Sequence, residues 1–253
     1  MTLVDISLAT VYGVFLIFCR VGGIVMLLPG IGETFVSPRI RLLFAILLSL
    51  IFAPLHYDII PALPSNYIPF ILLIAQEVTL GLILGMVVRI IMSSLHTFGM
   101  IMSFQSGLSS GMIFDPSQGT QGSLFGTFIT LLIITLIFAT NMHHMFITAI
   151  FHSYTLFAVG SYFEHYEDLS HLIIRTVAEA FDVGVKMSAP FLIAGLLIFI
   201  GSGIMSRLMP QLQIFFIMLP AQILIIIFMF MASIGAMAVW FLGYVEDYYT
   251  NLF

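Results

Sequence analysis

Charged residues are scarce in this sequence. They make up 8% of its 253 residues, against roughly 25% in an average soluble domain. Hydrophobic residues make up 61%, and the mean hydropathy is +1.18. Three stretches carry no charge, and each is as long as the ~20 residues that a helix needs to span a bilayer: 116–163, 187–206 and 208–245. The composition excludes a soluble globular protein and predicts a polytopic membrane protein.

Basic clusters and cysteine pairs are also missing. The net charge of −5 comes from twelve acids and seven bases spread thinly along the chain, so nothing in it would attract nucleic acid. Cys19 is the single cysteine, and its apolar surroundings favour a small buried side chain. The N-terminus lacks the basic region of a signal peptide and its apolar run contains Arg20, which predicts a retained first helix.

Patterns that bind metals or cofactors are absent. The seven histidines contain no H-E-x-x-H motif, and no Lys-Ser/Thr follows the glycines as a phosphate-binding loop requires. We therefore expect neither a metal nor a cofactor. The adjacent His143 and His144 lie at a polar corner and are expected to be interfacial or hydrogen-bonded residues.

Proline and glycine divide the chain into long apolar segments. The predicted apolar helices cover about 8–28, 42–52, 70–95, 187–205 and 214–245, with a helical hairpin at 123–159 and a proline-rich loop after residue 52. In the more hydrophilic stretch 161–186, apolar residues recur at helical spacing and predict an amphipathic helix: Leu172, Ile173, Val177, Phe181 and Val185. The expected fold is all-α, polytopic and membrane-type, with about six long apolar helices in hairpins and one amphipathic helix.

A polar insert at 105–126, QSGLSSGMIFDPSQGTQGSLFG, interrupts this apolar sequence. Gly and Ser leave backbone amides uncovered, which is costly in a bilayer unless the segment leaves the membrane or lines a cavity inside protein. Its G-x-S-x-G pattern would make Ser109 a hydrolase nucleophile, but no strand precedes it and the pattern is common in Gly/Ser-rich sequence. A histidine would have to act as the base, and the possible ones are His143, His144 and His152.

Three charged residues lie inside apolar runs: Arg20, Glu77 and Arg89. A charge at the centre of a spanning helix costs at least ~2.5 to 3.5 kcal/mol, so it usually faces a partner or water. We predict that Arg20 pairs with Glu77; the alternative is that both arginines extend toward the membrane surface. Glu77 and Arg89 could instead form the central site of a secondary transporter, which is a second functional hypothesis.

Two stretches resemble the characteristic segments of the FliR family, the export-gate proteins of flagellar biosynthesis with counterparts in type III secretion injectisomes. They are GLSSGMIFDPSQG at 107–119 and GIMSRLMPQLQIFFIMLP at 203–220. The opening, from Arg20 to Pro29 followed by VSPRIR, is also similar. The most specific piece is the signature at 206–215, and the resemblance covers essentially the whole chain.

The resemblance implies a non-enzymatic subunit forming one export-gate domain over 1–253. It would assemble with FliP-like, FliQ-like and FlhB-like subunits in the bacterial inner membrane, at the flagellar basal body, as the portal for unfolded export substrates. Its helices would form tilted hairpins, many of them above the membrane plane. We favour flagellar over injectisome use.

In that family the loop matching 107–122 closes the central channel as a plug. The resemblance implies that Met112, Ile113 and Phe114 supply an apolar stopper. The full set of expected plug residues is Gly107, Ser109, Ser110, Gly111, Met112, Ile113, Phe114, Asp115, Pro116 and Gly119. Expected structural or partner-contact positions are Arg20, Glu77, Arg207, Pro210, Gln211 and Phe215, and none is catalytic.

Overall fold

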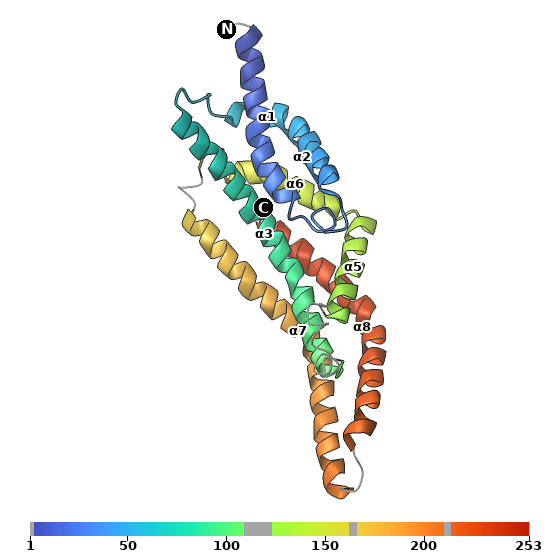
Figure 1. The fold of residues 1–253 in the computed structure, drawn as a ribbon. Helices are drawn as coiled ribbons and strands as arrows, with labels where there is room; N and C mark the ends of the chain where they lie inside the picture. The colour runs from blue at the N-terminus through green and yellow to red at the C-terminus, as the bar shows by residue number, and fades with distance from the viewer. Residues whose placement is uncertain (1–2, 109–122, 162–165, 210–213, 253) are drawn as a thin grey trace. The chain divides into compact units, whose positions relative to one another are not determined.

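The computed structural model describes residues 3–108, 123–161, 166–209 and 214–252 (Figure 1). These described residues form seven α-helices, one 3₁₀-helix and no strand, which confirms the all-α prediction. The helices are α1 (Leu3–Val25), α2 (Pro38–Phe52), η1 (Ala53–Ile59), α3 (Tyr67–Gln105), α5 (Leu124–Ala139), α6 (His143–Leu156), α7 (Tyr166–Leu208) and α8 (Ile214–Leu252).

Several helices are long and apolar enough to cross a membrane. Four segments of the described residues meet that criterion alone, and α5 with α6 would make a fifth span as a bent pair. The four are Pro38–His56, Tyr67–Gln105, Tyr166–Leu208 and Ile217–Leu252. Length and composition thus agree with the predicted polytopic membrane protein.

The amphipathic and apolar stretches predicted at 161–186 and 187–205 form one helix of 43 residues, α7. The sequence becomes more apolar after Lys186, but no glycine cap or loop ends the helix there. The helix continues through Pro190. The predicted separation into two helices is therefore wrong. A change of polarity along a chain does not end a helix unless its backbone hydrogen bonds are interrupted.

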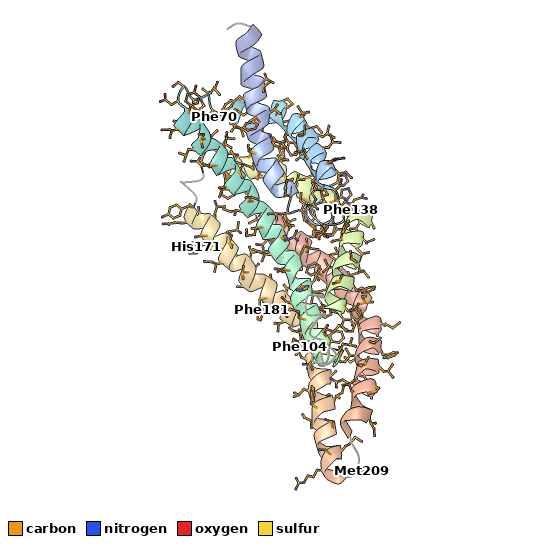
Figure 2. All side chains as sticks on the ribbon, viewed as in Figure 1. Phe70, Phe104, Phe138, His171, Phe181 and Met209 are labelled. Atoms are coloured by element: carbon orange, nitrogen blue, oxygen red, sulfur yellow. The ribbon has the colours of Figure 1, made fainter. Side chains whose placement is uncertain are left out.

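The buried face of α7 also differs from the predicted one. Val177 is 50% exposed and Phe181, labelled in Figure 2, is 63% exposed, whereas Thr176 and Ala180 are buried. The buried face continues through Val183 and Met187 at helical spacing, so it combines small and larger apolar side chains. Of the predicted stripe, Val177 and Phe181 lie outside, and the other three residues are partly exposed.

The segment predicted as a helical hairpin at 123–159 is a bent pair. The axes of α5 and α6 differ by 79° across the break at residues 140–142. Asn141 has a φ of 61°, a left-handed conformation that asparagine tolerates better than most residues. At this corner His144 Nδ1 is 3.2 Å from the Asn141 carbonyl, as expected for a hydrogen-bonded residue. His143 instead stacks on Phe138, and its buried Nδ1 has no hydrogen-bond partner among the described residues.

The described residues group into two compact units. Unit 1 comprises those of 1–91, 137–177 and 246–253, and unit 2 those of 92–136 and 178–245. The single export-gate domain expected from the sequence stays a prediction.

Unit 1 joins three separate stretches of sequence. Inside it α1 and α3 cross at glycines: a Cβ on Gly81 would overlap the carbonyl of Arg20, and one on Gly23 would overlap the main chain of Gly81. The end of α8 packs into the same unit, where Tyr248 Oη lies 2.7 Å from Thr176 Oγ1.

Unit 2 has an aromatic core. The ring of Phe230 on α8 lies 5.4 Å from that of Phe125 and 6.3 Å from that of Phe98, between ring centroids. Phe98 in turn contacts Phe191 of α7 at 5.8 Å. Aromatic pairs at these separations add to the stability that burial itself provides.

Candidate functional site

Two places in the described structure contain residues predicted to matter. One is the buried cluster around Arg20 and Glu77 in unit 1. The other is the C-terminal end of α3 in unit 2, from which the predicted plug segment begins. We describe each separately.

Arg20 and Glu77 lie one turn before the glycine crossing of α1 and α3. Arg20 Nε donates to Glu77 Oε2 at 2.8 Å and Arg20 Nη2 donates to Glu77 Oε1 at 3.0 Å. Both side chains are 0% exposed. The predicted pairing is thus confirmed, and the alternative that Arg20 extends to the membrane surface is wrong.

The guanidinium of Arg20 also holds the C-terminal end of α6. Its Nη1 donates to the carbonyls of Ser153 at 3.2 Å and Phe157 at 2.7 Å. The Ser153 carbonyl also accepts the Phe157 N–H at 3.0 Å, so Arg20 is its second donor. Donors from outside the helix commonly satisfy carbonyls at a helix C-terminus. Glu77 Oε1 in turn accepts from the backbone N–H of Gly160 at 3.0 Å, within a turn where Gly160 has a φ of 84°.

Tyr154 completes this cluster. The Arg20 Cζ atom lies 4.2 Å from the centre of the Tyr154 ring, which is cation–π geometry. The Tyr154 hydroxyl donates to the Ile17 carbonyl at 3.3 Å, so the ring is fixed to α1. We call this set of Arg20, Glu77, Tyr154 and the α6 carbonyls the Arg20 junction. It joins α1, α3 and α6, and its two charges face each other rather than a solvent-filled space.

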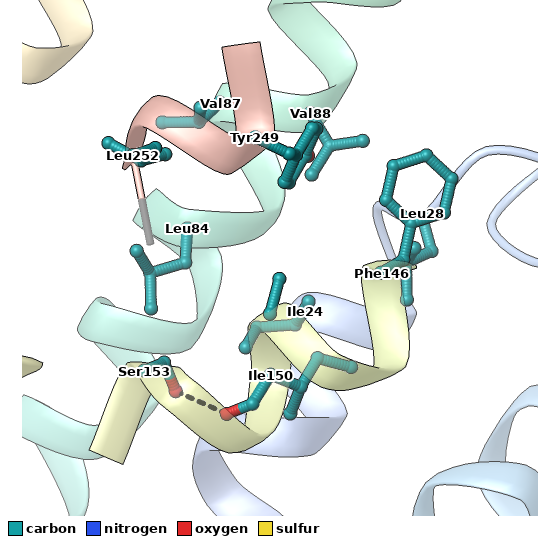
Figure 3. A pocket seen from close by; sticks show the side chains of 11 residues that line it. Ile24, Leu28, Leu84, Val87, Val88, Phe146, Ile150, Ser153, Tyr249 and Leu252 are labelled. Carbon is teal, nitrogen blue, oxygen red and sulfur yellow. Dashed lines mark hydrogen bonds between the residues drawn. The ribbon is translucent and has the colours of Figure 1, made fainter. Parts of the chain in front are cut away.

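A small cavity lies beside the junction (Figure 3). Its volume is about 20 Å³, which suits roughly one water molecule. Apart from Ser153, whose Oγ donates to the Ile150 carbonyl at 2.7 Å, its lining is mostly apolar. The side chains around it are Ile24, Leu28, Leu84, Val87, Val88, Phe146, Ala149, Ile150, Ser153, Tyr249 and Leu252. This space is too small for a transported solute.

Arg89 does not share a site with Glu77. The two residues are twelve positions apart on α3, which corresponds to about 18 Å along the helix, and Arg89 is exposed whereas Glu77 is buried. The transporter hypothesis requires both in one central site. The described structure does not bring them together.

In unit 2, hydrogen bonds fix the end of α3 where the polar insert begins. Gln222 of α8 donates from Nε2 to the Gln105 carbonyl at 2.6 Å. The chain then turns at Gly107, whose φ of 75° is one that other residues rarely adopt. The hydroxyls of Ser103 and Ser123 lie 2.8 Å apart, so the chain leaves and returns at nearly the same place.

A larger cavity of about 290 Å³ opens beside this end of α3. Its lining is uncharged and combines apolar side chains with hydroxyl and amide groups. The residues come from α3, α7 and α8: Phe104, Gly107, Ile198, Phe199, Ser202, Gly203, Ser206, Met218, Leu219 and Gln222.

Most predicted plug residues lie outside the described residues. Only Gly107 of that set is described; the others are Ser109, Ser110, Gly111, Met112, Ile113, Phe114, Asp115, Pro116 and Gly119. Among the partner-contact positions, Arg207 is exposed near the end of α7, and Phe215 lies in α8. Pro210 and Gln211 fall outside the described residues.

The sequence did not reveal several residues of these two places. The carbonyls of Ser153 and Phe157 are backbone atoms, so no residue type marks them. Gln222 lies within an apolar run, and a lone polar residue there is a detectable signal for a buried hydrogen bond.

Comparison with known proteins gives a consistent result. The family described as bacterial export proteins, family 1, matches residues 11–248. The flagellar biosynthetic protein FliR of Caulobacter vibrioides is 38% identical over 231 residues, covering 91% of this chain and 92% of that protein. FliR of Bacillus subtilis is 28% identical, covering 82% and 80%. The Yop proteins translocation protein T of Yersinia pestis is 28% identical over 64% of this chain and 62% of its own length.

Proposed function

Since this chain belongs to the family of bacterial export proteins, family 1, and is a component of a type III export apparatus, we propose that it forms the export channel together with FliP-like and FliQ-like subunits. An FlhB-like subunit would contact the same assembly. The channel would carry unfolded proteins across the bacterial inner membrane, at the base of the flagellum.

The observation that carries this proposal is the match to FliR over nine-tenths of both chains. The family model matches residues 11–248 and so includes part of every described helix, which means that the whole fold, and not one motif, supports a common role. Several FliR proteins are among the relatives, and the identity to the Caulobacter protein exceeds that to the Yersinia translocation protein. This difference favours flagellar use.

We propose further that the segment 107–122 plugs the channel at rest. Support comes from its described ends. The bond between Ser103 and Ser123 keeps them together, and Gln222 holds the end of α3. A segment anchored in this way can be displaced by a substrate without moving the helices that carry it. The energy for export would come from other subunits or from the proton gradient.

Ion leakage through the complex tests the plug. Deletion of Ser109 to Gly119 should raise the ion conductance of membranes that contain the complete complex. A finer variant replaces Met112, Ile113 and Phe114 with serine, and its control replaces Ser117, Gln118 and Thr120 with alanine in the same segment. An ion-tight deletion variant that still exports normally would show that the segment is not a plug.

The chain is proposed to act without enzymatic chemistry. If the hydrolase hypothesis were correct, Ser109 would react with a fluorophosphonate probe in the intact complex. We expect no labelling, and Ser109→Ala should leave export unchanged.

A further inference from the structure

Arg20 and Arg89 of unit 1 both lie inside apolar runs of sequence, and their surroundings differ. Arg20 is fully buried and its guanidinium donates to one carboxylate and two carbonyls. Arg89 on α3 is exposed and makes no hydrogen bond or ion pair with another residue in the described parts of the chain. The chain therefore neutralises the first charge internally and leaves the second available.

Arg89 follows five apolar residues on one exposed face of α3, and the same face continues beyond it with the exposed Ser93 and His96. The exposed residues that precede it recur at steps of three and four, so they share one face of the helix. They are Ile71, Ala75, Val78, Leu82 and Met86, followed by Arg89. We call these six residues the α3 stripe. It has the spacing by which one helix packs along another, with a small residue, Ala75, where close approach is easiest.

Arg89 is too far from either end of α3 to extend from a helix end toward the membrane surface. It is the 23rd of the 39 residues of α3, so about 33 Å of helix precede it and about 24 Å follow. An unpaired guanidinium among lipid tails is strongly disfavoured, and its planar set of donors matches a carboxylate in bidentate fashion.

We propose that the α3 stripe is a docking surface for a helix of another subunit of the export apparatus, and that this helix carries an aspartate or glutamate that pairs with Arg89. The positive charge of Arg89 favours an acidic residue on the partner. The helical spacing of the apolar residues in the stripe favours a helix as the partner. This inference rests on the proposed function, because it requires that the chain assembles with other export subunits. It adds a specific contact, at the α3 stripe, that membership of the family does not indicate.

Site-specific crosslinking tests where the stripe lies in the complete complex. A photoreactive amino acid at Met86, one turn from Arg89, should crosslink to a protein subunit in cell membranes. The same substitution at Arg39, exposed at the start of α2, controls for surface position. Crosslinking of position 86 to lipid alone, or to nothing, would overturn the docking surface.

Charge variants test the pairing. Arg89→Glu should lower both the crosslinking yield from position 86 and the copurification of the partner at least tenfold, whereas Arg89→Lys should retain most of both. Replacing the acidic residue of the crosslinked helix with arginine should restore assembly of Arg89→Glu. Normal assembly of Arg89→Glu alone would overturn the acidic partner, even if position 86 crosslinks to protein.

The outcomes separate this inference from the proposed function. If the wild-type chain purifies without any other subunit, the proposed function itself fails. If the complex is intact while position 86 remains uncrosslinked, the export-gate role stands and the α3 stripe is not its docking surface. Because Arg89 is exposed, equal amounts of the variants in membranes are expected and confirm that the chain itself is folded.

Discussion

Arg20 contacts both carboxylate oxygens of Glu77, at 2.8 and 3.0 Å, in a place where neither side chain is exposed. The pair alone would not satisfy the guanidinium, and its remaining donors reach the carbonyls at the end of α6. Arg20 is thus a donor for two different kinds of acceptor. This distinction leads to separate predictions for removing the charge of Glu77 and for exchanging the two charges.

Removing the charge of Glu77 should destabilise unit 1. Glu77→Gln keeps an oxygen for the Gly160 N–H but leaves a buried arginine without its counter-ion, which costs about 3–5 kcal/mol of unfolding free energy. Denaturation of the purified protein in detergent measures the change. The matched control is Asp182→Asn, which breaks an exposed ion pair with Lys186 and should cost less than about 1 kcal/mol.

Exchanging the charges should fail to restore stability. In the double variant Arg20→Glu, Glu77→Arg an ion pair can form again, but residue 20 can no longer donate to the carbonyls of Ser153 and Phe157. We expect the double variant to remain at least about 1.5 kcal/mol less stable than the wild type, since a hydrogen bond from a charged donor contributes about 1.5–3 kcal/mol. Full recovery would show that the ion pair alone matters.

Replacing a glycine with alanine should change the stability of the protein differently at Gly81 of unit 1 and at Gly243 of unit 2. A Cβ on Gly81 overlaps the Arg20 carbonyl, so Gly81→Ala must separate α1 from α3, at a cost of about 1–3 kcal/mol. Gly243 of α8 has open space around its Cβ position, and Gly243→Ala should be neutral or stabilise the isolated chain by up to about 1 kcal/mol. Thermal unfolding of both variants under the same detergent conditions gives the comparison, and equal losses would contradict the crossing.

The end of α3 should loosen when Gln222 is replaced. Gln222→Leu has a similar size but leaves the Gln105 carbonyl without its donor, so residues 100–105 should exchange their amide hydrogens faster. Ser202→Ala is the control, because the Ser202 hydroxyl bonds only within its own helix, to the Phe199 carbonyl. Unchanged exchange near Gln105 in Gln222→Leu would mean that other contacts hold this end.

Sequence reasoning located the helices where apolar length decides the outcome. The apolar run of α8 follows from the uncharged stretch after Arg207, and α2 ends at Phe52 as predicted, although it begins at Pro38 and not at 42. It also paired Arg20 with Glu77, because charges inside apolar runs have few possible partners. The prediction wrongly divided α7 into two helices, because it took a change in polarity as a helix end. The backbone hydrogen bonds of the helix continue across that point.

Other features depend on three-dimensional packing and could not be predicted. Thr176 and Ala180 are buried while Phe181 is exposed, because the face of α7 that meets its neighbours is set by packing and not by the hydrophobicity of each residue. The acceptors on α6 are main-chain atoms supplied by a distant segment. The expected plug falls outside the described residues except for Gly107, so its residues stay a prediction.

The division of unit 1 into three stretches of sequence sets the order in which it can be built. Arg20 meets its acceptors 133 and 137 positions later in the chain, and Thr176 meets Tyr248 only when the end of α8 exists. At 5–20 residues per second, the ribosome needs roughly 8–30 s to proceed from residue 91 to residue 246. Until synthesis reaches the end of α8, the helices made first lack a segment that completes their core.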